Sequence, residues 1–139
     1  MIEKYNDLLK IHKALEVAIR GFDKARNSAG VDTEIYETRR DSVIKRFELS
    51  YDLLWKYLRE YVAHTQGTQA DSPRKVFQLC LEYDIVNEQE AEQLQKMITT
   101  RNQTAHVYDV DLANDIAIKI HAHYQLIHTL VTRIVPNKD

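Results

Sequence analysis

The scarcity of helix-breaking residues constrains this chain more than any other feature of its sequence. There are 3 glycines and 2 prolines among its 139 residues. These are the two residue types that most disfavour a helix interior, and all-β or disordered chains use them freely. The chain is therefore expected to form long helices. Its length suits a single helical domain spanning residues 1–139.

Apolar residues recur every three or four positions through most of the chain, which is the spacing of an amphipathic helix. The clearest series lies between residues 44 and 61, and two further series lie between residues 8 and 25 and between residues 116 and 134. No segment alternates in the manner of a strand. The pattern predicts an all-α fold, a four-to-five-helix up-and-down antiparallel bundle with short loops.

Capping residues mark where the later helices should begin. Ser72 precedes a proline, and Asn87 stands three residues before a glutamate, as in a capping box. Asp109 or Asp111 is expected to cap the last helix, which should end at Pro136. The basic residues near position 40 are expected to open the second helix.

Charge, cysteine content and hydropathy restrict the class of protein. The net charge is -2, which excludes nucleic-acid binding by overall charge but leaves room for a local basic patch. The one cysteine, Cys80, cannot form an intrachain disulfide and fits a reducing compartment. No apolar run approaches the ~18 residues of a membrane span, and the polar start lacks a signal-peptide core. We expect a cytoplasmic protein with no membrane partner.

One arginine breaks the apolar stripe of the fourth predicted helix. The stripe Ala91, Leu94, Ile98 continues at position 101, which is Arg101. A charged residue there needs a partner, an interface or an aqueous cleft. His106 follows five residues later, roughly 140° away on an unbroken helix. Either the helix ends within this run, or the two groups converge across a two-fold dimer.

The chemistry of this run suits cleavage of RNA. Arginine binds phosphate through two hydrogen bonds, and a histidine near its ordinary pKa can move protons. Together Arg101 and His106 could assist attack of a 2′-hydroxyl on the neighbouring phosphate, a reaction that needs no metal. No pair of carboxylates is spaced as a two-metal site. His121 and His123 are two residues apart and make poor co-ligands on a helix, so neither a metal nor another cofactor is expected.

Residues 101–108, RNQTAHVY, resemble the signature of the HEPN family, which is Arg, a polar residue, three more, His, any residue, Tyr. Residues 46–56, RFELSYDLLWK, are similar to the second helix of one HEPN branch. That branch is named for nucleotidyltransferase substrate-binding proteins, the partners of minimal nucleotidyltransferases. The resemblance covers nearly the whole chain.

The resemblance implies a homodimer that acts as the ribonuclease toxin of a toxin–antitoxin pair. Arg101 would bind phosphate and His106 would move the proton, at a cleft between two subunits, with Asn102 in support. The partner nucleotidyltransferase would silence the toxin by adenylylating Tyr108. An added AMP places bulk and negative charge beside the arginine that should receive RNA.

Four basic residues are expected to contact RNA phosphates: Arg39, Arg40, Lys45 and Arg46.

Two alternatives to the ribonuclease stay open. The first alternative is a non-catalytic substrate-binding or regulatory subunit of a two-component nucleotidyltransferase. The second is a structural helical dimer with no site, in which an ordinary ion pair within one subunit holds Arg101.

Overall fold

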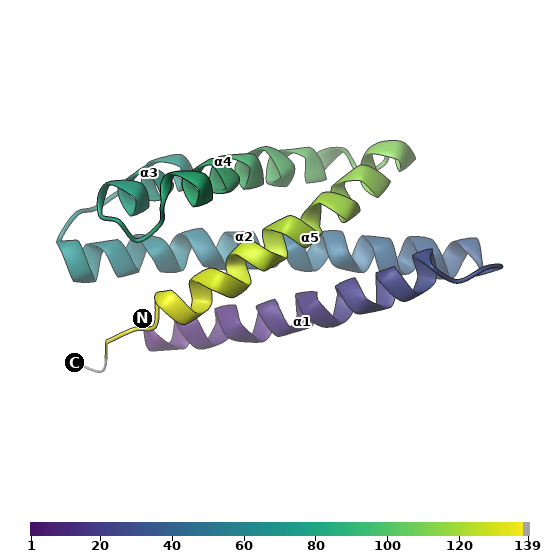
Figure 1. Ribbon diagram of the computed structural model, residues 1–139, viewed down its shortest axis with the longest axis horizontal. Helices are drawn as coiled ribbons and strands as arrows, with labels where there is room; N and C mark the ends of the chain where they lie inside the picture. The colour runs from purple at the N-terminus through teal and green to yellow at the C-terminus, as the bar shows by residue number, and fades with distance from the viewer. Residues whose placement is uncertain (138–139) are drawn as a thin grey trace.

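The computed structural model describes residues 1–137. Within that range the regular elements are all helical, which confirms the all-α prediction (Figure 1). They are listed here in chain order: α1 (Ile2–Arg26), α2 (Thr33–Gln66), α3 (Pro73–Glu82), α4 (Glu88–Gln103), the short 3-10 helix η1 (Thr104–His106) and α5 (Val110–Arg133).

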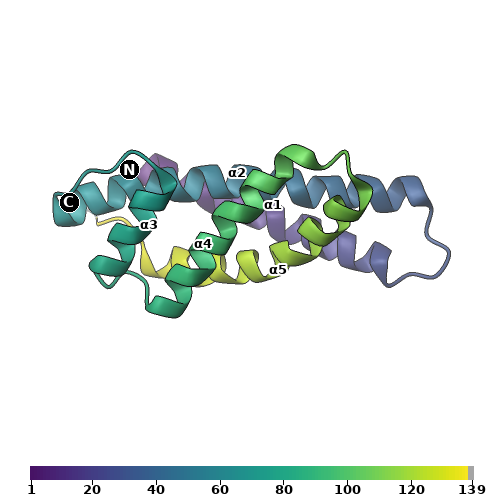
Figure 2. The same ribbon diagram turned by 90° about the horizontal axis from the view of Figure 1, so that it is seen from above.

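The helices form a long bundle built on α1 and α2. These two helices lie antiparallel and side by side along their length (Figure 1). The short α3 and then α4 lie on the side of α2 opposite to α1, and α5 crosses the molecule obliquely (Figure 1). Seen from above, α4 also runs obliquely to α2 (Figure 2). The end of α5 reaches the start of α1, where the Tyr5 hydroxyl donates to the Val131 carbonyl at 2.6 Å. The turn between α4 and α5 therefore lies far from the chain's first residues.

Local capping signals set most helix ends, as the sequence predicts. Ser72 caps α3 with Pro73 in its first turn, and Asn87 exchanges hydrogen bonds with Glu90 in a complete capping box. Asp109, rather than Asp111, caps α5 by accepting from the Leu112 amide at 3.1 Å. Each cap satisfies amides that the first helical turn leaves without partners.

The second helix begins earlier than the apolar stripe suggests. Asp32 accepts from the Glu34 amide at 2.8 Å and starts α2 at Thr33. The expectation that the basic residues near position 40 open this helix is wrong, because Arg39 and Arg40 lie in its second turn. The helix ends at Gln66, and Gly67 follows it with a φ of 72°, a conformation that glycine adopts without strain.

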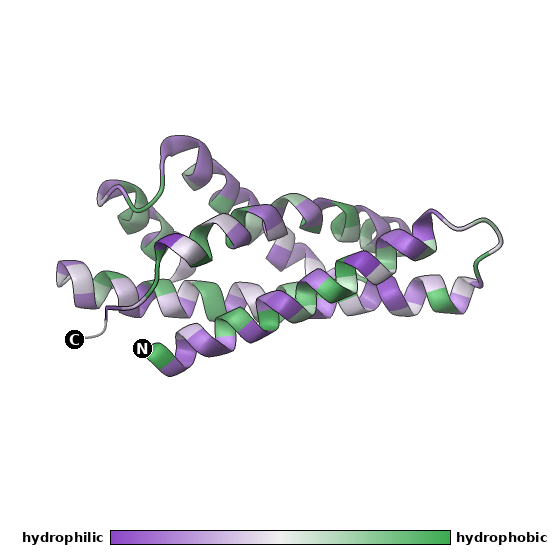
Figure 3. Ribbon diagram, turned by 60° about the horizontal axis from the view of Figure 1, so that its bottom comes forward, coloured by the Kyte–Doolittle hydropathy of each residue, from purple (hydrophilic) through white to green (hydrophobic). Residues whose placement is uncertain are grey.

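The core follows the middle of α2. Phe47, Leu54 and Leu58 have no exposed surface, and Ile116 and Ile120 of α5 are equally buried. Full burial of one such side chain contributes roughly 1.5–3 kcal/mol. Apolar and polar residues interleave along each helix, as amphipathic helices require (Figure 3). None of the helices within residues 1–137 combines the length and apolar character that crossing a bilayer requires.

Candidate functional site

The run that carries Arg101, His106 and Tyr108 forms the corner between α4 and α5. Helix α4 ends at Gln103, η1 follows, and Asp109 caps α5. Thr104 stabilises this corner, because its buried hydroxyl donates to the Arg101 carbonyl at 2.6 Å. The helix does end within this run, as one of the two expected arrangements requires. We call residues 101–108 the α4–α5 corner.

Arg101 points from α4 toward α2, where two carboxylates hold it. Its Nη1 donates to Glu48 at 2.9 Å and to the Thr104 hydroxyl at 3.0 Å. Its Nε and Nη2 donate to the two carboxylate oxygens of Asp52 at 3.4 and 3.3 Å. A guanidinium has five N–H donors, so one remains. In this state Arg101 cannot hold a phosphate through two hydrogen bonds unless it releases at least one of these three partners.

The electrostatics of Arg101 follow from these contacts. Its side chain is 28% exposed. Partial burial acts to lower the pKa of Arg101, but the hydrogen bonds and charge of Asp52, with the charge of Glu48, raise it above its usual value. The guanidinium stays positive beside two carboxylates. The ion pair that the structural alternative requires is therefore present within one chain.

His106 and Tyr108 lie together on the outer side of the corner. The Tyr108 hydroxyl is 3.5 Å from Nδ1 of His106, and the two rings are nearly perpendicular. Tyr108 is 82% exposed, and Asn102 is also exposed. Among the residues that the structure describes, no hydrogen bond joins Arg101 to His106. A single chain thus brings His106 and Tyr108 together and directs the Arg101 guanidinium elsewhere.

The four basic residues of α2 do not share one open surface. Arg40 is 5% exposed and donates to Asn114 of α5 at 3.1 Å. Arg39 and Arg46 donate to backbone carbonyls of α1 at 3.1 and 2.8 Å. Lys45 is exposed and stands three residues before Glu48, on the same face of α2. Arg39 and Lys45 are the two exposed residues of the four, and Lys45 is the nearer of them in sequence to Glu48 and Asp52.

The carboxylate partners of Arg101 are the residues that sequence reasoning missed. Glu48 and Asp52 are four residues apart, so they lie on one face of α2. Two acidic residues on one face of the most apolar stretch of α2 indicate that a positively charged side chain packs against them. The signal does not say which cation, because Arg101 is about fifty residues away in the chain.

The histidines of α5 contact separate partners. His121 lies 2.9 Å from Asp23, His128 lies 3.0 Å from His12, and buried His123 lies 2.8 Å from the Thr100 hydroxyl. Within residues 1–137 no three histidine, cysteine or acidic side chains are grouped so that they could hold a metal ion.

Comparison with known proteins adds the family. A family model described as "nucleotidyltransferase substrate binding protein like" matches residues 6–135. This chain belongs to that family. The match includes both the α4–α5 corner and the α2 face that binds Arg101, and it confirms the branch that residues 46–56 resemble. The toxin role and the RNA substrate stay predictions.

Comparison with solved structures supports the fold. A crystal structure of a Thermus thermophilus protein aligns with a TM-score of 0.70 at 24% sequence identity. The alignment covers 88% of this chain and 99% of that one. At this identity the likeness shows that the two share a fold. The comparison with curated proteins gave no match.

Proposed function

We propose that this chain is the partner subunit of a nucleotidyltransferase, and that Tyr108 is the side chain to which the transferase adds a nucleotide. The observation that carries the proposal is the 82% exposure of Tyr108 on a corner that is anchored at both ends. Arg101 and Thr104 tie one end of the corner to α2 and α4, and Asp109 caps α5 at the other. An acceptor held in this way reaches a partner's active site without a large ordering cost.

The chemistry of the transfer can use the neighbouring imidazole. The Tyr108 phenol oxygen attacks the α-phosphorus of ATP, a new O–P bond forms, and the bond to the β-phosphate breaks so that pyrophosphate leaves. The phenol proton must go to a base. His106 is 3.5 Å from that oxygen and can accept the proton through Nδ1. The transferase supplies the ATP site.

The test is co-expression with a minimal nucleotidyltransferase, the class of partner that the proposal requires, followed by intact mass spectrometry. The wild-type chain should gain the mass of AMP, and Tyr108→Phe should not. Tyr36→Phe is the matched control, since Tyr36 is half-buried and packs against Phe22. An adduct retained by Tyr108→Phe, or a stable complex with no adduct on the wild type, contradicts the proposal.

A second candidate function is the metal-independent ribonuclease, in which Arg101 and His106 act across a homodimer with Asn102 in support. The observation that favours it is the exposure of His106 beside Tyr108, since a nucleotide on Tyr108 would cover the imidazole. This activity requires Arg101 to exchange at least one of its present partners, Glu48, Asp52 or Thr104, for an RNA phosphate. Lys45 would then supply exposed positive charge near Glu48, with Arg39 farther along α2, and Arg40 and Arg46 would contribute only if they left their present contacts.

The two functions separate in one assay. Protein made without the transferase is incubated with total RNA in the presence of a metal chelator. Ribonuclease activity predicts cleavage by the wild type, loss of cleavage in His106→Ala, and no loss in His64→Ala, an exposed histidine at the far end of α2. If the RNA stays intact with all three proteins and Tyr108 carries an AMP adduct, the acceptor function is supported and the ribonuclease function is excluded.

A further inference from the structure

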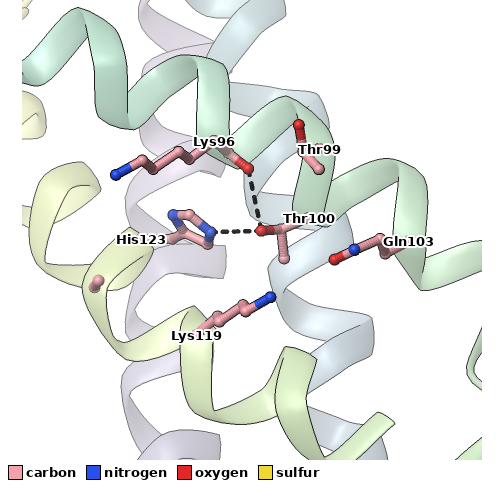
Figure 4. Close-up of a pocket in the computed structure, with 7 residues that line it drawn as sticks. Lys96, Thr99, Thr100, Gln103, Lys119 and His123 are labelled. Atoms are coloured by element: carbon pink, nitrogen blue, oxygen red, sulfur yellow. Dashed lines mark hydrogen bonds between the residues drawn. The ribbon is translucent and has the colours of Figure 1, made fainter. Parts of the chain in front are cut away.

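A pocket of about 340 Å³ lies between α4 and α5, next to the α4–α5 corner (Figure 4). Arg101 leaves α4 toward α2, whereas Thr100 leaves it toward α5, so the pocket and the Arg101 ion pairs lie on different sides of α4. The pocket's volume is at the lower end of the range for small-molecule sites, roughly 300–1,000 Å³. It has room for one small molecule.

Two buried polar side chains form the floor of this pocket. Thr100 is 4% exposed and His123 is 6% exposed. The Thr100 hydroxyl has one hydrogen and donates it to the Lys96 carbonyl at 3.1 Å, so it accepts from Nε2 of His123 at 2.8 Å (Figure 4). The His123 ring also stacks on Phe47, which fixes its plane.

This arrangement sets the protonation of His123. Because Nε2 carries the hydrogen, Nδ1 of the neutral ring is an acceptor with a free lone pair. Burial, with the charge of Lys119, lowers the pKa of His123 to about 4, so the ring is neutral at pH 7. Within the described residues the hydrogen bond of this ring is the one to Thr100. The pocket floor therefore offers an acceptor to a ligand's O–H or N–H group.

Positive charge surrounds the pocket mouth. Lys96 and Lys119 line it from opposite helices, the Gln103 amide lies at one end, and no acidic residue is among the lining residues. In Figure 4 the Lys119 ammonium group extends toward the Thr100 side of the pocket. Lys96 has one carboxylate within reach, Glu92 at 3.9 Å, and both side chains are well exposed, so this pair is weak.

We propose that this pocket binds a small organic anion, whose charged group lies between Lys96 and Lys119 and whose hydrogen-bond donor meets Nδ1 of His123. The apolar part of the ligand lies against the side chains of Thr99 and Ala122. A phosphate ester and an aromatic carboxylate share this chemistry. The proposal does not depend on Tyr108 being an acceptor, because none of its contacts involves that residue.

The experiment measures binding to the full chain by calorimetry and by amide chemical shifts, with four probes. They are AMP, 4-hydroxybenzoate, the neutral nucleoside adenosine, and inorganic phosphate. The proposal expects AMP or 4-hydroxybenzoate to bind and to shift the amides of Thr100 and His123. Which of the two binds better distinguishes a phosphate ester from a carboxylate. Adenosine should bind at least about tenfold more weakly than AMP.

Two variants test the location without disturbing the core. Lys119→Gln removes one exposed charge, and Ala122→Phe fills the pocket from an exposed position. Each should weaken binding about tenfold or more, whereas Lys10→Gln, an exposed lysine of α1, should not change it. Three results overturn the proposal. The first is that neither organic anion binds, and the second is that both pocket variants keep the wild-type affinity. The third is that inorganic phosphate binds as tightly as the organic anions, which would show that the pocket takes an adventitious ion only.

Discussion

Replacing Arg101 by methionine tests whether this residue anchors the α4–α5 corner. The substitution keeps an unbranched but shorter side chain, and it removes the charge together with contacts to three side chains. Two of the lost hydrogen bonds, to Glu48 and Thr104, have ordinary lengths of 2.9 and 3.0 Å. The two to Asp52 are longer, at 3.3 and 3.4 Å, and are weaker for that reason.

The expected loss follows from the length and exposure of these contacts. We assign about 1 kcal/mol to the Glu48 ion pair, and about 0.5 kcal/mol each to Asp52 and Thr104, since all of them lie partly open to solvent. The total is about 2 kcal/mol. With an unfolding entropy of about 2.1 cal/mol/K per residue, a chain of this length should lose about 7 °C in Tm.

Thermal and urea unfolding followed by circular dichroism measure this loss. Arg20→Met is the matched control, because Arg20 is well exposed and pairs within its own helix with Glu16. That variant should change stability by less than about 0.5 kcal/mol. If Arg101→Met unfolds like the wild type, Arg101 is not an anchor, and its guanidinium is available for phosphate.

Three further predictions concern the rest of the fold. Burial lowers the pKa of His12 and of His123 from 6.5 to about 4, so the unfolded chain binds protons at these histidines more readily than the folded chain does. The free energy of unfolding should therefore be highest above pH 6.5 and should fall as the pH is lowered toward 4. At pH 5 the loss should be about 2 kcal/mol per histidine, measured by urea titration. Equal stability at pH 7 and pH 5 would contradict this. Asn87→Ala should cost about 1 kcal/mol in the same assay through loss of the capping box, and no change would show that the cap is unimportant. Phe47→Ala should cost about 3–5 kcal/mol, and a value below about 1 would contradict its packed position.

Local signals account for what the sequence predicted correctly about the fold. The Ser72–Pro73 pair and the spacing from Asn87 to Glu90 act within a few residues, so the same residues cap α3 and α4 in the folded chain. The start of α2 was missed because its first turns carry no apolar stripe. The signal there is Asp32, a capping residue whose effect does not depend on periodicity.

Contacts between distant segments account for what the sequence could not supply. The stripe showed that Arg101 needs a partner, but Glu48 and Asp52 lie about fifty residues earlier in the chain. His123 lies within the apolar series between residues 116 and 134, and it is buried. Its partner Thr100, and the pocket above them, depend on how α4 and α5 cross, which no spacing within one helix encodes.

Peptide mapping of the chain after co-expression with the proposed partner, a nucleotidyltransferase, tests the central claim most directly. Trypsin should release residues 102–119 as one peptide, and Tyr108 is the one tyrosine in it. The account predicts that fragmentation of this peptide places an AMP group on Tyr108. Recovery of the peptide in unmodified form, or an AMP group on any other residue of the chain, would contradict the claim that this corner presents the acceptor.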